Sequence, residues 1–189
     1  LNPDADLLIV DSDSPIPPPC DTVGVLQLGD NIGHLSRGGG DGWGRAFCAG
    51  LRYAVAADYD WIVHIETDLL FVRSVSVMLD RMTRTGVRLS APWATPYMFL
   101  ETALMFMDWQ AASRIALGYN WENGIGQPEL RVEEMVRDDW FVSPLRGARD
   151  DLRVSDLRKT FPGGADYLTH AEIGKYRELL AQAGMEEAK

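Results

Sequence analysis

Hydrophobic residues recur along the chain with two different periods, which predict alternating strands and helices. Short apolar runs rich in β-branched residues predict strands, and apolar residues spaced three and four apart predict helices. The expected strands are Asp6–Val10, Val23–Leu28, Trp61–Ile65, Arg88–Ala91, Tyr97–Met107 and Trp140–Val142. The expected helices are Trp43–Ala57, Ser74–Thr85, Trp109–Leu117, Glu129–Val136 and Ala171–Ala183. This order predicts an α/β protein whose mostly parallel sheet is flanked by helices.

The segments between these elements are rich in proline and glycine, which predicts loops. Ser12–Pro19 contains four prolines, Gly29–Gly44 contains seven glycines, and Gly118–Gln127 contains three glycines. Both residue types interrupt regular structure, and long loops of this kind often carry function. Ala148–Gly164 is polar and shows no clear period. No repeat and no linker divides the chain, so we expect a single domain over residues 1–189.

The composition is that of an ordinary globular protein with an acidic balance. Hydrophobic residues make up 46% of the chain and charged residues 24%, and the formal net charge is −10. A nucleic-acid partner is not expected, because phosphate binding requires clusters of Lys and Arg. No apolar run reaches the length of a membrane span, so the expected location is the cytoplasm, with a peripheral contact to a membrane left open. The sequence starts at Leu1, directly before a strand, so an earlier segment with a first strand is also left open.

Cysteine and histidine are sparse, and several common catalytic motifs are absent. Cys20 and Cys48 lack metal-ligand spacing and are expected to be reduced and structural. His34, His64 and His170 are too scattered for a zinc motif, and His64 is expected to be a core residue of its strand. The glycine-rich loop lacks the dinucleotide-binding spacing, and the chain contains neither G-x-x-x-x-G-K-[ST] nor G-x-S-x-G.

Two carboxylates directly after a buried strand are the strongest chemical signal in the sequence. Glu66-Thr67-Asp68 follows the strand Trp61–Ile65. In open α/β sheets, ligands bind at the carboxyl ends of strands. Two hard oxygen donors at such a place suit Mg²⁺ or Mn²⁺, and these ions commonly serve substrate phosphates. The alternative is a turn that carries two solvated acids.

The motifs of the first third of the chain follow one another in a characteristic order. In sequence, they are Asp11 at a strand end, Asn31-Ile32-Gly33, Arg45, Gly50-Leu51 and Glu66-Thr67-Asp68. This order resembles the nucleotide-sugar glycosyltransferases of GT-A fold, particularly the large inverting family with the pattern N-x-G-x-x-x-A-R-N-x-G-L, strand, D-x-D. The resemblance covers Ala5–Phe71. It departs from the pattern in a longer glycine loop, a longer spacing between Arg45 and Gly50, and Glu66 in place of the first Asp.

The resemblance implies a donor site in residues 1–71 and an acceptor half in residues 72–189. Asp68 would bind Mn²⁺ or Mg²⁺ directly, and Glu66 would reach the metal, a metal-bound water or the ribose of a UDP-sugar. Position in the chain makes His170 a candidate for a further metal ligand, with helix capping as the alternative.

The nucleotide contacts implied by the resemblance are Asp11, Arg45 and Asn31. Asp11 would accept a hydrogen bond from the base or ribose, with a plain loop acid as the alternative. Arg45 would bind the nucleotide or its diphosphate from the start of a helix, and its alternative is a surface salt bridge. Asn31 would belong to the same nucleotide site or order the glycine loop, and its alternative is an asparagine that serves only the turn.

The acceptor side has two candidates for a general base. Glu101 lies in an apolar run, where burial would raise its pKa, unless it pairs with a buried arginine. Glu129 precedes a helix after the expected acceptor loop, the position of the base in the resembling family, and its alternative is an acid that favours the first helical turn. Tyr119 and Trp121 are candidates for a sugar-stacking platform, or for a lid.

The sequence therefore predicts a metal-dependent glycosyltransferase that transfers a sugar from a nucleoside diphosphate, with UDP favoured, to an unknown acceptor. Three alternatives stay open: a UDP-binding protein without turnover on the same scaffold, a sugar nucleotidyltransferase, and an acidic structural protein whose resemblance is coincidental.

Overall fold

The structure is a computed structural model that describes ten segments of the chain. These are residues 5–18, 23–31, 40–67, 69–71, 74–90, 93–94, 99–100, 102–118, 147–149 and 167–169, together with Arg177 and Ala181. The helices in these segments are α1 (Gly40–Ala56), α2 (Val75–Thr85) and α3 (Trp109–Gly118). The strands are β1 (Leu8–Asp11), β2 (Gly24–Gln27), β3 (Trp61–Ile65), β4 (Leu69–Phe71), β5 (Leu89–Ser90), β6 (Trp93–Ala94), β7 (Phe99–Leu100), β8 (Leu104–Asp108), β9 (Gly147–Arg149) and β10 (Tyr167–Thr169).

The three described helices were all predicted from the sequence, but α1 starts earlier than expected. It begins at Gly40 rather than Trp43, so its first turn includes glycines that the sequence assigns to a loop. Glycine weakens a helix by about 1 kcal/mol relative to alanine. Tertiary packing outweighs that cost here, because the next turns bury Phe47, Cys48 and Leu51.

The strand expected over Tyr97–Met107 is two strands. β7 and β8 are separated by a turn that includes Thr102 and Ala103, both buried. The short strands β4, β6, β9 and β10 were not predicted, because two or three residues are too few to show a period. The expected elements Glu129–Val136 and Trp140–Val142 lie outside the described residues, as does most of Ala171–Ala183.

The expectation of a mostly parallel sheet is wrong for the described strands. β1 pairs with β2, and β9 with β10, in parallel. β8 pairs antiparallel with both β3 and β5, β10 pairs antiparallel with β4, and β6 with β7. The prediction came from the alternating order of strands and helices. That order does not fix the direction of β8, because a central antiparallel strand covered on both faces needs the same apolar residues as a parallel one.

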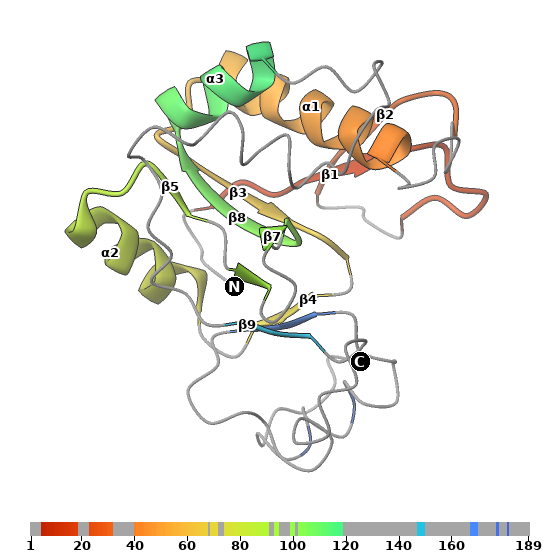
Figure 1. Cartoon of the computed structure of the whole chain (residues 1–189). Helices are drawn as coiled ribbons and strands as arrows, with labels where there is room; N and C mark the ends of the chain where they lie inside the picture. The colour runs from red at the N-terminus through yellow and green to blue at the C-terminus, as the bar shows by residue number, and fades with distance from the viewer. Residues whose placement is uncertain are drawn as a thin grey trace.

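Helices cover both faces of the central sheet β3-β8-β5. In Figure 1, α1 and α3 lie together on one side of β3 and β8, and α2 lies on the other side. β8 supplies side chains to both layers in alternation, as expected from the period of two in a strand. Met105 and Met107 join the cluster under α1 and α3, whereas Leu104 and Phe106 join Met78 and other residues of α2.

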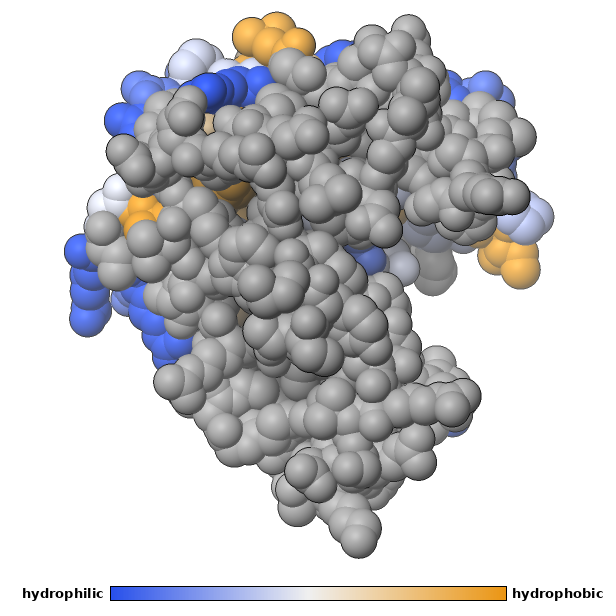
Figure 2. Space-filling model, in the orientation of Figure 1, coloured by the Kyte–Doolittle hydropathy of each residue, from blue (hydrophilic) through white to orange (hydrophobic). Residues whose placement is uncertain are grey.

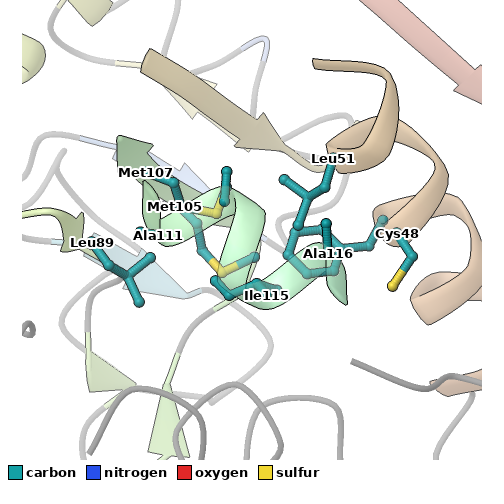
Figure 3. Packing of buried hydrophobic residues seen from close by; sticks show 10 residues of the cluster. Cys48, Leu51, Leu89, Met105, Met107, Ala111, Ile115 and Ala116 are labelled. Atoms are coloured by element: carbon teal, nitrogen blue, oxygen red, sulfur yellow. The ribbon is translucent and has the colours of Figure 1, made fainter. Parts of the chain in front are cut away.

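The cluster between α1, α3 and the sheet fixes the position of α1. Figure 3 shows Leu51 and Cys48 of α1 on the right, beside Ala116 and Ile115 of α3, with Met105 of β8 to their left. These residues are at most 3% exposed. Because α1 packs against both α3 and the sheet, its first turns have a defined position relative to the strand ends.

The contact between α1 and β1 depends on a glycine. A Cβ atom at Gly50 would lie 3.2 Å from the Cγ2 atom of Val10. The missing side chain therefore allows the helix to lie directly on the strand.

Hydrophilic residues predominate at the left edge of the view in Figure 2, next to α2, and hydrophobic side chains are isolated among the coloured residues of that face.

Candidate active site

The carboxyl ends of β1 and β2 lie side by side. The two strands are parallel, with Asp11 opposite Gln27 in the register. The backbone N–H of Leu28 donates to the carbonyl oxygen of Asp11 at 2.9 Å, which extends the pairing by one residue. The chain therefore leaves both strands at the same edge, which is where ligands bind in folds of this class.

The strand β3 runs in the same direction close by. The hydroxyl of Tyr59, just before β3, donates to the carboxylate of Asp6, just before β1, at 2.6 Å. At the other end, Trp43 in the first turns of α1 contacts Glu66, which directly follows β3. Arg45 in the same turns contacts Asp30, which follows β2. The segments after β2 and β3 thus contact the amino-terminal turns of α1, and the end of β1 lies beside the end of β2.

Asp11 is buried at the end of β1 and is held by the following turn. Asp11 is 5% exposed. The carboxylate accepts hydrogen bonds from the backbone N–H of Ser14 at 3.2 and 3.3 Å and from the Ser14 hydroxyl at 2.5 Å. These bonds fix the start of the proline-rich loop. The contact of Asp11 with a base or ribose stays a prediction.

Arg45 forms the salt bridge that was its alternative interpretation. Its guanidinium pairs with the carboxylate of Asp30. It also donates to the carbonyl oxygens of Leu28 at 3.0 Å and Asp30 at 3.3 Å. The side chain is 21% exposed, so it lies at the surface of the site while holding the segment after β2. Asn31 is exposed and ends the same described segment.

Glu66 is fixed by both its backbone and its side chain. Its N–H donates to the carbonyl oxygen of Ala103 at 2.9 Å, and its carbonyl oxygen accepts from the N–H of Leu69 at 3.3 Å. The Oε1 atom accepts a hydrogen bond from the indole Nε1–H of Trp43 at 2.7 Å. A bond of this length to a charged acceptor is of the stronger kind. The carboxylate therefore has a defined position at the end of β3.

The prediction that His64 packs inside the protein is confirmed in part: its Nε2 atom is buried, but it has no hydrogen-bond partner among the described residues. The imidazole packs edge-on against Phe47 and Trp43, with ring centroids 4.9 and 5.7 Å apart. Burial lowers the pKa of His64 to about 4, because the charged form of the ring would lose its hydration in these surroundings. His64 is therefore neutral at physiological pH. It packs against Trp43, the residue that donates a hydrogen bond to Glu66.

The described residues include one member of the expected metal site. Within the part of the chain that the structure describes, no group of three His, Cys, Asp or Glu side chains could hold a metal. Glu66 fits as a single donor, because its carboxylate is a hard ligand at a strand end. The other expected ligands and acceptor-side residues lie outside the described residues; they are Asp68, His170, Glu101, Glu129, Tyr119 and Trp121.

Cys48 has the structural role that was predicted for it. The residue is fully buried and is not in a disulfide bond, and burial raises the pKa of its thiol to about 11. The thiol is therefore protonated and unreactive at neutral pH. Cys20 lies outside the described residues.

Sequence reasoning missed Trp43 as a residue of this site. The sequence places it only at the start of a helix, where an aromatic side chain usually serves packing. Its contact with Glu66 spans β3 and most of α1, so no local pattern could reveal it. The single sequence signal is that an indole N–H needs an acceptor when it is partly buried.

The α/β fold is similar to that of a protein of known structure. No protein-family model and no curated protein matches the chain. Among solved structures, it is similar to a glycosyltransferase involved in the glycosylation of the major capsid of PBCV-1, with a TM-score of 0.51 and 8% sequence identity. The match covers 82% of this chain and 81% of the other. At this identity the likeness concerns the fold. None of the described helices is long and apolar enough to cross a membrane.

Proposed function

We propose that this protein is a metal-dependent glycosyltransferase that uses a nucleoside-diphosphate sugar, with UDP as the favoured nucleotide. The observation that carries the proposal is that the first turns of α1, which contain Arg45, contact Glu66 after β3 and Asp30 after β2, and that β2 ends beside Asp11 of β1. Asp11, Arg45 and Glu66 come from three different segments of the chain, and the resemblance assigns each of them to the donor site. The fold shared with a viral glycosyltransferase supports the same class of reaction.

The charge balance of the chain is consistent with a metal at this site. With a formal net charge of −10, the protein repels an anionic donor unless positive charge is supplied locally. Arg45 supplies one cation at the end of β2, although Asp30 already pairs with it. A divalent cation bound by Glu66 and Asp68 would neutralise the diphosphate and stabilise the charge that develops on it during transfer.

The protein's own groups would hold the donor on three sides. Asp11 lies at the end of β1, where its carboxylate would meet a base or ribose after a change in the Ser14 turn. Arg45 would contact the diphosphate from the helix, and Glu66 would hold the metal. The acceptor hydroxyl would give its proton to Glu129 or Glu101, and His170 would complete the metal shell.

Two related functions share the same site. A UDP-binding protein without turnover would bind the nucleotide in the same metal-dependent way. A sugar nucleotidyltransferase would instead join a nucleoside triphosphate to a sugar phosphate. Both are separated from the proposal by product analysis rather than by binding.

The test is calorimetric titration of UDP with Mn²⁺ and with EDTA. We expect UDP to bind more tightly with Mn²⁺ than with EDTA, and we expect this Mn²⁺-dependent part of the binding to disappear in Asp68→Ala. Asp80→Ala is the matched control, because it removes an exposed carboxylate from α2, where Asp80 is 70% exposed beside Arg84. Absence of binding of any nucleoside diphosphate to the wild type would refute the proposal.

Turnover is then measured as release of UDP from UDP-sugars, with Mn²⁺ present. Release that Asp68→Ala abolishes identifies a transferase acting on water in place of the acceptor. Binding without release identifies the non-catalytic alternative. Formation of a nucleotide sugar from UTP and a sugar 1-phosphate identifies the nucleotidyltransferase.

A further inference from the structure

Trp43 connects the first turns of α1 to the end of β3 through one short hydrogen bond. Its indole N–H donates to Glu66 Oε1 at 2.7 Å, in a partly buried place. An indole can only donate, so the bond requires an acceptor on the Glu66 side. A carboxylate accepts such a bond more strongly than a neutral group does.

The indole itself is held in place by rings on α1 and β3. It stacks on Phe47, with centroids 4.7 Å apart and planes inclined by 22°. Its edge also meets the imidazole of His64 at 87°. Phe47 is 3% exposed and belongs to the core cluster shared with α3. The donor is therefore anchored to the core of the protein, and the acceptor takes its position from that anchor.

Glu66 is longer by one methylene group than the aspartate that the D-x-D pattern has at this position. Its backbone is tied to Ala103 and Leu69, so the side chain must span the distance to α1 by its own length. Glutamate spans it and forms the bond with Trp43. An aspartate on the same backbone has a shorter reach, so its carboxylate would withdraw from the indole.

We infer that Trp43 is a positioning residue that holds the Glu66 carboxylate ready to bind the divalent cation of the donor complex, and that this is why glutamate stands at position 66. The inference rests on the proposed function. A carboxylate fixed before the ligand arrives loses less conformational freedom on binding. One oxygen is oriented by Trp43, which sets the direction that the carboxylate presents to the cation.

The first experiment tests the hydrogen bond without any ligand. Urea unfolding is measured for the wild type, Trp43→Phe, Glu66→Ala and the double variant. Trp43→Phe keeps a ring that can stack on Phe47 and removes the N–H. A hydrogen bond to a charged group predicts a coupling of about tenfold or more in the unfolding constant. Strictly additive effects would overturn the inference.

The second experiment measures UDP affinity with Mn²⁺ and with EDTA. In Trp43→Phe we expect the Mn²⁺-dependent part of the affinity to fall about tenfold, while the metal-free affinity is unchanged. Trp109→Phe is the matched control, because the Trp109 indole donates to the carbonyl oxygen of Val55 at 3.2 Å, near the other end of α1. A purely structural role for Trp43 would change stability and leave the ratio of the two affinities as in the wild type.

Glu66→Asp provides a variant that keeps the carboxylate and spares the aromatic cluster. It restores the acid of the D-x-D pattern, yet we expect the same loss of Mn²⁺ dependence, because the shorter side chain leaves the indole. Equal or tighter Mn²⁺-dependent binding in Glu66→Asp or Trp43→Phe would overturn the inference. A wild type that binds no UDP with Mn²⁺ would overturn the proposed function and the positioning role together, and the unfolding experiment would still report on the hydrogen bond itself.

Discussion

The buried imidazole of His64 makes the stability of this protein sensitive to acid in a defined range. Burial lowers the pKa of His64 from 6.5 to about 4. In the unfolded chain the ring binds a proton near pH 6.5, whereas in the folded chain it does so only near pH 4. The contribution of the neutral His64 ring to the free energy of unfolding is therefore fully present above pH 6.5. It is lost as the pH falls from 6.5 towards 4, and it does not change further below pH 4. A pKa difference of this size corresponds to roughly 3 kcal/mol of unfolding free energy.

Replacement of His64 by phenylalanine removes the titration and keeps a ring beside Trp43 and Phe47. It also removes the unpartnered Nε2 atom, whose burial costs about 1–3 kcal/mol. Phenylalanine is slightly larger than histidine, and overpacking opposes this gain. At pH 7 the two effects offset each other in part. The stability advantage of the variant over the wild type should then grow by roughly 3 kcal/mol between pH 7 and pH 4.

The assay is urea unfolding of both proteins, followed by circular dichroism at several pH values from 4 to 8. The carboxylates titrate in both proteins, so their contributions cancel in the difference. A difference that rises steadily as the pH falls supports a buried neutral imidazole. If the difference between the two proteins is the same at every pH, His64 is not shielded from solvent and the reasoning fails.

Three further predictions concern the core, a helix cap and a thiol. Phe106→Ala should cost about 3–5 kcal/mol in urea unfolding, because Phe106 is fully buried beneath α2; a loss below 1 kcal/mol would contradict this packing. Asp108→Ala should lower stability by about 1–2 kcal/mol, because the carboxylate accepts from the N–H of Ala111 at 2.7 Å at the start of α3; Asp108→Asn should keep most of it, and equal losses would argue against capping. In a Cys20→Ser variant, Cys48 should resist iodoacetamide at pH 8 until the protein is unfolded, since its pKa is raised to about 11; rapid labelling in the folded state, read by mass spectrometry, would show that the thiol is accessible.

Helices and strands whose own residues show a clear apolar pattern over several positions were predictable from the sequence. The helices α2 and α3 show their apolar stripe within one segment, and β3 is a continuous apolar run. The start of α1 was not predictable, because its glycines oppose a helix locally and packing against α3 decides the outcome. The direction of β8 was also out of reach, since a strand buried on both faces has the same composition whichever way it runs.

The candidate site was predictable where it depends on strand ends and not where it depends on contacts between elements. Asp11 and Glu66 follow apolar runs, so their places at the sheet edge could be expected. The partners that hold them could not, because Ser14 acts through a turn and Trp43 acts across a helix and a strand. A surface salt bridge of Arg45 was the alternative to nucleotide binding, without a named partner, and the structure has such a bridge with Asp30.

The alternation of β8 between two helical layers has a consequence for folding kinetics. Neither layer can be completed before β8 is in register with β3, and these strands are far apart in the sequence. Pairing over such a separation slows folding, because the entropy cost of closing a long loop comes before the stabilising contacts between the strands can form. A slip of one residue would exchange Met105 with Phe106 and disturb both layers at once. The backbone amides of β8 should therefore be among the last to exchange with deuterated solvent, and their exchange should report the opening of both layers as one unit.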